Sequence, residues 1–219
     1  MQTTNSLTMR ILLLHVIVYV AALGTLGNAF CEEAKTKLKT KLLTDFFLSE
    51  EKTNIWEITN EQVYGGESVG RFELYDGEVL ILGKTKSGSG GLLSFRSKPK
   101  IWNTGEYEGL LIHLKGDGKS YLATIRTKQH VRNRQISWRA KFTTKKNLDN
   151  WQVIKLPFES FHPYVYKVDS KRFLTKGASV DPESIESIGI MIDDSKTTGF
   201  KVRVDKIEAY KTIIPQESR

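Results

Sequence analysis

A two-residue hydrophobic repeat runs through most of this chain beyond residue 43, and it constrains the fold more than any other feature. Between Ser68 and Tyr75, one face of an extended chain carries valine, arginine and glutamate, and the other carries glycine, phenylalanine and leucine. Side chains of a strand alternate between its two faces, so this repeat predicts a β-strand. Asp76-Gly77 joins it to a second alternating run, Glu78–Gly83, which predicts a β-hairpin.

Similar short runs continue along the rest of the chain. We predict further strands at Gly91–Ser97, Gly109–Lys115, Ser120–Thr127, Gln135–Phe142, Trp151–Leu156, Ser187–Asp193 and Phe200–Tyr210. Glycine-rich turns separate several of them, and Pro157 ends the strand before it because proline has no N–H to donate. So many short strands without a long helical repeat predict an all-β sandwich or jelly roll. We place this domain at residues 43–210 and a loose tail at 211–219.

The N-terminal part of the chain has a different pattern. Residues 11–30 carry no charge, with Arg10 before them and Glu32 after them. Small residues near the end of this run suit cleavage of a signal peptide after Ala29, and the run is also long enough for an uncleaved membrane anchor. We therefore expect residues 1–29 to send the chain into the secretory pathway or to anchor it in a membrane.

The segment between this run and the sandwich is basic. Its apolar residues Ala34, Leu38 and Leu42 recur every four positions among lysines. This spacing predicts a short basic amphipathic helix, placed at residues 30–42, that packs on the domain or lies on a membrane surface.

The chain as a whole is basic, with 33 lysines and arginines against 25 aspartates and glutamates and a formal net charge of +8. This charge favours acidic partners and allows peripheral contact with a membrane. No basic run is interleaved with stacking aromatic residues, so no nucleic-acid module is predicted. The single cysteine, Cys31, cannot form an intramolecular disulfide, so packing must hold the core.

The sequence shows no pattern of residues that predicts catalysis or metal binding. Its histidines lack ligand spacing, and His113 suits a structural position within a strand. There is no Gly-x-Ser-x-Gly motif, and Cys31 lies outside the predicted sandwich. We therefore predict a binding protein that is not an enzyme and has no cofactor.

Four short blocks, in this order, resemble the complex I intermediate-associated protein 30 family. The blocks are Trp56 with Asn60–Ser68, Tyr107–Leu110 with Lys115–Tyr121, Trp151–Phe161, and Ile185–Gly189 with Gly199–Ile207. In the family the first block reads like Trp, then Asn-Asp-x-Val-Met-Gly-Gly-x-Ser; here Glu61 and Tyr64 replace the Asp and the Met. Together the blocks span about residues 43 to 210.

The resemblance implies a galactose-binding-like jelly-roll β-sandwich. It also implies a chaperone-like assembly factor that holds intermediates of mitochondrial NADH:ubiquinone oxidoreductase, or complex I, by protein–protein binding. A mitochondrial location is thus the alternative to the secretory pathway. The residues matching the family motifs, each either structural or in contact with a partner, are Trp56, Gly65, Gly66, Ser68, Gly116, Asp117, Gly118, Trp151, Pro157, Phe158 and Phe161.

Elementary chemistry suggests structural tasks for some of these residues. Gly65-Gly66 suits a tight turn or bulge with positive φ, and Asp117 between two glycines suits a hairpin turn. Phe158 and Phe161 are expected to anchor the chain to the core after Pro157, each burial contributing on the order of 2 kcal/mol.

A carbohydrate-binding module of the secretory pathway is the alternative function. Jelly rolls bind sugars through exposed aromatic side chains and polar loop groups. Trp102, Tyr164 and Tyr166 fall in predicted loops, where their rings would be able to stack on a ligand.

Overall fold

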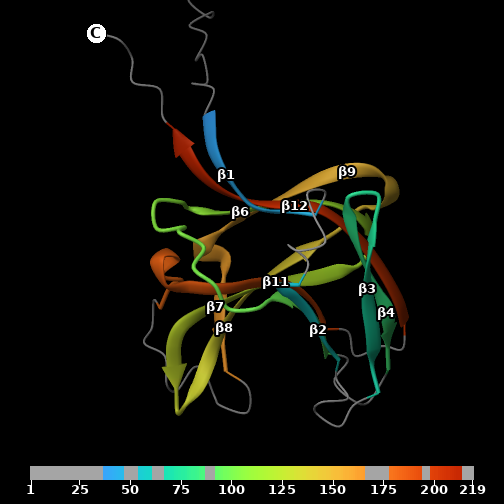
Figure 1. Cartoon of the computed structure of the whole chain (residues 1–219), viewed down its shortest axis with the longest axis horizontal. Helices are drawn as coiled ribbons and strands as arrows, with labels where there is room; N and C mark the ends of the chain where they lie inside the picture. The colour runs from blue at the N-terminus through green and yellow to red at the C-terminus, as the bar shows by residue number, and fades with distance from the viewer. Residues whose placement is uncertain are drawn as a thin grey trace, which may run out of the picture. The chain divides into compact units, whose positions relative to one another are not determined.

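Two antiparallel sheets, each of six strands, pack face to face across an apolar core (Figure 1). The computed structural model describes residues 37–46, 54–60, 67–86, 92–165, 178–193 and 198–213. Of these, Leu38–Ile213 belong to one compact unit. The predicted all-β sandwich is therefore confirmed, and no α-helix occurs in the described ranges.

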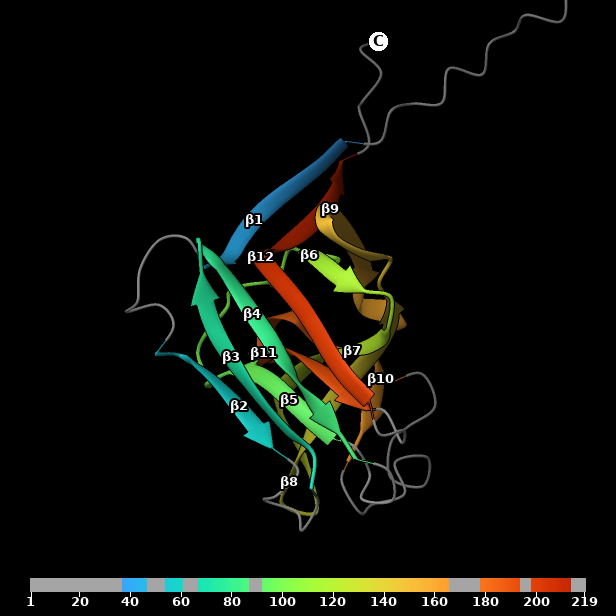
Figure 2. The ribbon, with the colours of Figure 1, turned by 90° about the vertical axis from the view of Figure 1, so that its right-hand side faces the viewer.

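The first sheet, called sheet A, mixes early and late strands of the chain. Its order is β3 (Val69–Tyr75), β4 (Glu78–Thr85), β12 (Thr198–Ile213), β6 (Gly109–Asp117) and β9 (Lys146–Pro157), with β1 (Lys37–Asp45) also paired to β12. β12 is long enough to pair with β4 along its first half and with β6 along the rest. Sheet A therefore brings the predicted β3–β4 hairpin next to the last strand of the chain (Figure 2).

The second sheet, called sheet B, forms the other layer. Its order is β10 (His162–Tyr164), β8 (Arg134–Thr143), β7 (Ser120–Val131), β11 (Ile185–Asp193), β5 (Leu92–Ser97) and β2 (Trp56–Asn60). Two single-turn 3₁₀-helices, Phe158–Ser160 and Pro182–Ser184, lead into β10 and β11. All nine predicted strands are present, whereas β1, β2 and β10 were not predicted.

The predicted helix over residues 30–42 is wrong where the structure describes it. Residues 37–42 belong to β1, which pairs with β12, and Phe46 N–H donates to Asp205 O at 3.2 Å just beyond the strand. A spacing of four is even, so Leu38 and Leu42 also share one face of a strand. A spacing of four therefore fits both a helix and a strand, and pairing with β12 selects the strand. The predicted membrane contact through an amphipathic helix is then no longer supported.

The core consists of alternate residues of both sheets. Its largest fully buried side chains include Trp138, Tyr121, Phe95 and Phe161. Trp56 stacks on Phe95 with ring centroids 4.8 Å apart. Such contacts supply dispersion energy in addition to the removal of apolar surface from water.

The ends of the chain are only partly covered by these ranges. Residues 1–36, with the apolar segment and Cys31, lie outside the described residues, as do residues 214–219. β12 continues to Ile213, beyond the predicted end of the sandwich at residue 210. Within the described ranges, no helix has the length and apolar character needed to cross a bilayer.

Candidate functional site

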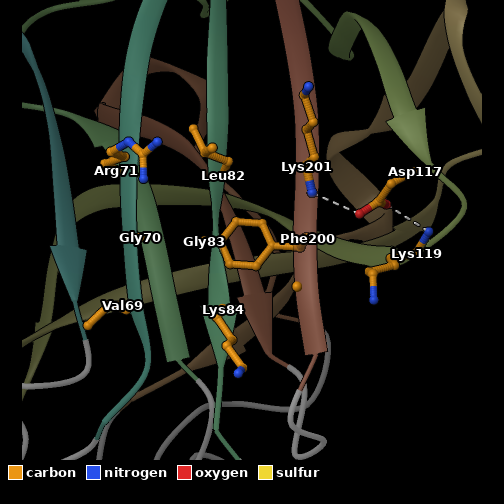
Figure 3. Close-up of a pocket in the computed structure, with 11 residues that line it drawn as sticks. Val69, Gly70, Arg71, Leu82, Gly83, Lys84, Asp117, Lys119, Phe200 and Lys201 are labelled. Atoms are coloured by element: carbon orange, nitrogen blue, oxygen red, sulfur yellow. Dashed lines mark hydrogen bonds between the residues drawn. The ribbon is translucent and has the colours of Figure 1, made fainter.

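A hollow of about 670 Å³ lies on the outer face of sheet A, between β3, β4, β12 and the β6–β7 hairpin (Figure 3). Its lining residues are Val69, Gly70, Arg71, Leu82, Gly83, Lys84, Asp117, Lys119, Gly199, Phe200 and Lys201. The hollow therefore involves three of the sequence blocks: it adjoins the block ending at Ser68, and residues of the second block (117 and 119) and of the fourth block (199–201) line it.

Glycines form the floor of this hollow. Gly70, Gly83 and Phe200 lie opposite one another across β3, β4 and β12. A Cβ atom on Gly83 would lie 2.4 Å from Val69 O and 2.8 Å from the Phe200 ring, so only glycine fits there. Because the strand has no side chain at this position, the Phe200 ring lies across it, as Figure 3 shows.

Four cationic side chains surround the floor. Arg71 and Lys201 both lie opposite Leu82 in the outward-facing row, and Lys84 follows in the next outward row. Arg71 Nε contacts the exposed Glu73 carboxylate at 2.6 Å, and Lys119 Nζ donates to the Thr198 hydroxyl at 2.5 Å.

Three of these cations lack a counter-ion among the described residues. Lys84, Lys119 and Lys201 form no ion pair there, whereas Arg71 pairs with Glu73. The hollow is thus lined by positive charge that this part of the protein does not neutralise.

Among the described residues, Asp117 is the one acidic residue that lines the hollow, and its carboxylate accepts hydrogen bonds from the protein itself. One oxygen accepts from Lys119 N–H and from Tyr121 O–H, both at 3.0 Å, and the other accepts from Lys201 N–H at 2.9 Å. Burial, and the Asp117 charge beside it, raise the pKa of the Tyr121 phenol. Asp117 therefore ties the hairpin to β12, and the predicted turn is confirmed, with Gly118 at φ +89°.

The middle of the same face holds a group of half-buried ion pairs. Glu78 on β4 contacts Lys115 on β6 at 3.3 Å and Arg203 on β12. Further along, His113 Nε2 lies 2.7 Å from Glu208 Oε2. Burial acts to raise the Glu208 pKa, but hydrogen bonds from Thr40 and Lys206 and the nearby cations outweigh it, so the pKa is lowered.

The far edge of sheet A is apolar and exposed. On β9, which ends the strand order, Trp151 is 45% exposed and Val153 is 53% exposed. Lys115 Nζ lies 4.1 Å from the Trp151 ring centroid, which links this edge to the ion pairs. The outer face of sheet A thus runs from a basic hollow, across ion pairs, to an exposed apolar pair.

The outer face of sheet B has a smaller and more polar hollow of about 90 Å³. Its lining residues include Arg96, Arg126, Arg139, Ser137 and Tyr164. The Arg139 guanidinium carbon lies 3.5 Å from the Tyr164 ring centroid, close enough for stacking. Both outer faces therefore carry basic groups, but with different side-chain chemistry.

The three predicted stacking aromatics do not form one group. Trp102 is only 4% exposed, its indole N–H donates to Glu186 O at 3.1 Å, and the Lys100 ammonium lies 3.8 Å from its ring centroid. The prediction that Trp102 stacks on a ligand is therefore wrong, because its loop folds back onto the core. Tyr164 does line a hollow, and Tyr166 lies outside the described residues.

Most of the described motif residues have structural positions. Trp56, Phe158 and Phe161 are buried in the core, as expected for the two phenylalanines. Ser68 is buried, and its hydroxyl accepts from Lys86 N–H at 3.1 Å.

Two further motif positions are also structural. A Cβ on Gly116 would lie 2.1 Å from the Thr144 Cβ, so this position requires glycine. β9 ends at Pro157, as predicted. Gly65 and Gly66 lie outside the described residues.

Sequence reasoning did not identify the cations of the hollow or Val153 as site residues. The alternation does assign Arg71 to the face opposite Phe72. No local pattern, however, shows that β4 pairs with β12, so the meeting of Arg71 and Lys201 beside Leu82 was not predictable. In the described part of the chain, no three His, Cys, Asp or Glu side chains are grouped as metal ligands.

The fold is a two-sheet antiparallel β-sandwich that resembles solved carbohydrate-binding modules. The family 11 carbohydrate-binding module of a cellulosomal cellulase of Clostridium thermocellum is 17% identical, with a TM-score of 0.59 over 79% of this chain and 95% of that one. The module in complex with a β-1,3-1,4-mixed-linked tetrasaccharide gives a TM-score of 0.55 at 17% identity, over 78% of this chain and 94% of the module. An agarase gives a TM-score of 0.51 at 11% identity, over 77% of this chain and 26% of the agarase chain. At these identities the likeness shows the fold alone.

The chain belongs to the complex I intermediate-associated protein 30 family, whose model matches residues 45–204. This match covers the first three sequence blocks and the fourth as far as Val204, and it confirms the resemblance drawn from them. A search of curated proteins found no match.

Proposed function

We propose that this protein is a non-catalytic assembly factor for mitochondrial respiratory complex I, which holds a protein partner on the outer face of sheet A. Membership of the complex I intermediate-associated protein 30 family supports the role. The observation that carries the choice of surface is the exposed pair Trp151 and Val153 on β9.

An exposed tryptophan beside an exposed valine has the composition of a protein-binding hot spot. Tryptophan is enriched among the few interface residues that supply most of the binding free energy. β9 is an edge strand in the order of sheet A, so a partner can approach its side chains and its free edge together. The neighbouring Lys115 and Glu78 provide a polar rim of the kind that surrounds such centres.

Affinity capture of the tagged chain at native expression level tests this role. We expect capture to recover complex I subunits, and Trp151→Ala to reduce that recovery at least tenfold, since hot-spot truncations cost about 2 kcal/mol or more. Ile101→Ala is the matched control, because Ile101 is an exposed apolar residue that lies outside sheet A. Recovery of no complex I subunit by the wild-type chain would contradict the proposal.

The compartment is part of the same proposal. An assembly factor for complex I must reach mitochondria, whereas residues 1–29 suit export or anchoring. Microscopy of a C-terminally tagged chain, combined with N-terminal sequencing of its mature form, separates the two. A chain found only in the secretory pathway would rule out the complex I role.

Carbohydrate binding is the second candidate, and it is favoured by the outer face of sheet B. The hollow there combines Tyr164, guanidinium groups and small hydroxyl side chains, which are groups that bind sugar hydroxyls and rings. A related sandwich has been solved with a mixed-linked tetrasaccharide bound. A glycan array probed with the wild-type chain and with Tyr164→Ala tests this candidate; absence of any wild-type signal would remove it.

A further inference from the structure

We infer that the hollow of sheet A binds an acidic, extended segment of the partner protein. The inference rests on the proposed function in one respect, that a protein occupies this face. The chemistry of the segment follows from the lining of the hollow.

The lining has an excess of positive charge. Among the described residues, its cations are Arg71, Lys84, Lys119 and Lys201. They stand against the carboxylate of Asp117 and that of Glu73, which pairs with Arg71, so two positive charges remain. Three backbone or hydroxyl donors already occupy the Asp117 oxygens. A carboxylate-bearing ligand would therefore meet cations whose charge this part of the protein leaves uncompensated, and complementary charge favours both encounter and orientation.

The cations are spread out and do not converge on one point. Figure 3 shows them around Gly83 and Phe200, on separate strands and on the hairpin. Arg71 and Lys201 flank Leu82 in one row, so their backbones lie about 10 Å apart at the usual strand spacing. A single tetrahedral anion is too small to bridge such a span. An extended peptide presents carboxylates on one face about 7 Å apart, which suits dispersed cations.

The floor suits the rest of such a segment. Leu82 and Val69 give it apolar contacts, on which the methylene stems of glutamate can pack, whereas the Phe200 ring is buried in the core. Gly199 adds no side chain to the outer face, and the nearest atom to a Cβ built there is 3.8 Å away. A peptide backbone can therefore approach the sheet closely at this point.

Fluorescence anisotropy with labelled peptides of alternating glutamate and alanine tests the inference on the purified chain. We expect binding that weakens as salt is added, and no binding of the matching glutamine–alanine peptide. The double variant Lys84→Glu with Lys201→Glu should bind at least about tenfold more weakly. Lys98→Glu with Lys128→Glu changes the net charge equally at exposed lysines outside the hollow, and should bind like wild type.

Two results in this assay would overturn the inference. One is an equal loss in both double variants, which would mean that only net charge matters. The other is wild-type binding no stronger for the acidic peptide than for the glutamine peptide. Vesicles of phosphatidylcholine with phosphatidylserine form a third arm: vesicle binding that needs Lys84 and Lys201, without peptide binding, would assign the hollow to a membrane surface and overturn the inference.

The capture experiment separates this inference from the proposed function. If recovery of complex I subunits needs Trp151 but is unchanged by the Lys84 and Lys201 substitutions, the function stands and the acidic-segment inference fails. If the acidic peptide binds as expected while no complex I subunit is recovered, the chemistry of the hollow stands and the assigned partner is wrong. Unchanged unfolding temperatures of both double variants confirm that the fold is intact.

Discussion

The two outer faces of the sandwich share a backbone plan but carry different chemistry. Sheet A offers a broad hollow ringed by lysines and an arginine, together with the exposed pair Trp151 and Val153. Sheet B offers a narrow hollow lined by arginines, hydroxyl groups and Tyr164. The comparison shows that, because side chains alternate along a strand, the outward-facing residues of the two sheets can differ in chemistry while the inward-facing residues of both form one apolar core.

Area and charge distribution explain why we assign the protein partner to sheet A. A protein interface needs several hundred square ångströms from each partner, with an aromatic centre and a polar rim. The outer face of sheet A extends across the strands from β3 to β9 (Figure 2). Trp151 is exposed on β9, and the Glu78–Lys115 ion pair lies beside it. The hollow of sheet B is large enough for one small polar group, which suits a sugar substituent better than a protein surface.

The largest expected effect is on the hairpin that builds one wall of the sheet A hollow. Asp117→Ala removes three hydrogen bonds and leaves the buried Tyr121 hydroxyl without its acceptor, so the free energy of unfolding should fall by about 2 to 4 kcal/mol. Urea denaturation followed by tryptophan fluorescence measures it. Asp149→Ala, at an exposed acid on β9, should change stability by less than about 0.5 kcal/mol. Equal effects of the two substitutions would mean that the wall is not built in this way.

The second-largest effect separates the binding roles of the two faces. Trp151→Ala should weaken partner binding by about 2 kcal/mol and leave any saccharide binding unchanged, because Trp151 lies on sheet A and Tyr164 lies on sheet B. Tyr164→Ala should do the reverse. Surface plasmon resonance against the captured partner, paired with the glycan array, gives both readouts. Loss of partner binding in Tyr164→Ala alone would invert our assignment of the faces.

A smaller effect depends on pH and tests the ion pairs in the middle of sheet A. The Glu208 pKa is lowered from 4.5 in the folded protein, so its ionised form contributes stability above that value and loses it as pH falls through the folded pKa. Glu208→Gln should therefore cost about 1 kcal/mol at neutral pH. The difference from wild type should shrink below pH 4.5, as measured by urea denaturation across pH. A difference that does not depend on pH would assign the effect to packing.

The smallest effect concerns the repulsion among the cations of the hollow. Lys201→Gln should raise the free energy of unfolding by a few tenths of a kcal/mol at low salt, since it relieves like-charge repulsion. Added sodium chloride should remove the gain, because salt screens exposed charges. Urea is the suitable denaturant, being uncharged. Lys98→Gln, outside the hollow, should not raise the free energy of unfolding. A similar rise there would mean that the effect comes from the net charge of the protein and not from the cations of the hollow.

Local pattern was enough to predict most of the sandwich from the sequence. The alternation in β3 and β4 and the glycines around Asp117 are properties of neighbouring residues, and the structure confirms both the strands and the turn. Pairing between distant segments was not accessible in this way. The spacing in β1 also fits a helix, and only its pairing with β12 identifies it as a strand. Likewise, no local pattern around Trp102 predicts the hydrogen bond from its indole N–H to the Glu186 carbonyl.

The candidate site was less predictable than the fold for the same reason. Trp151 and Asp117 were identified through family motifs, but their roles differ: one is exposed at an edge, and the other is engaged in hydrogen bonds. The basic hollow exists because Leu82 and Lys201 lie opposite each other across more than a hundred residues of intervening chain. Sequence periodicity gives the face of each strand, and only the strand order brings those faces together.

Site-specific photo-crosslinking in cells most directly tests whether sheet A holds the partner. The photoreactive residue p-benzoylphenylalanine would replace Val153 on sheet A in one variant and Tyr164 on sheet B in another. We predict crosslinks to a subunit of complex I or its assembly intermediates from position 153 and none from position 164. Crosslinks to such a subunit from position 164 alone, or to no protein from position 153, would contradict it.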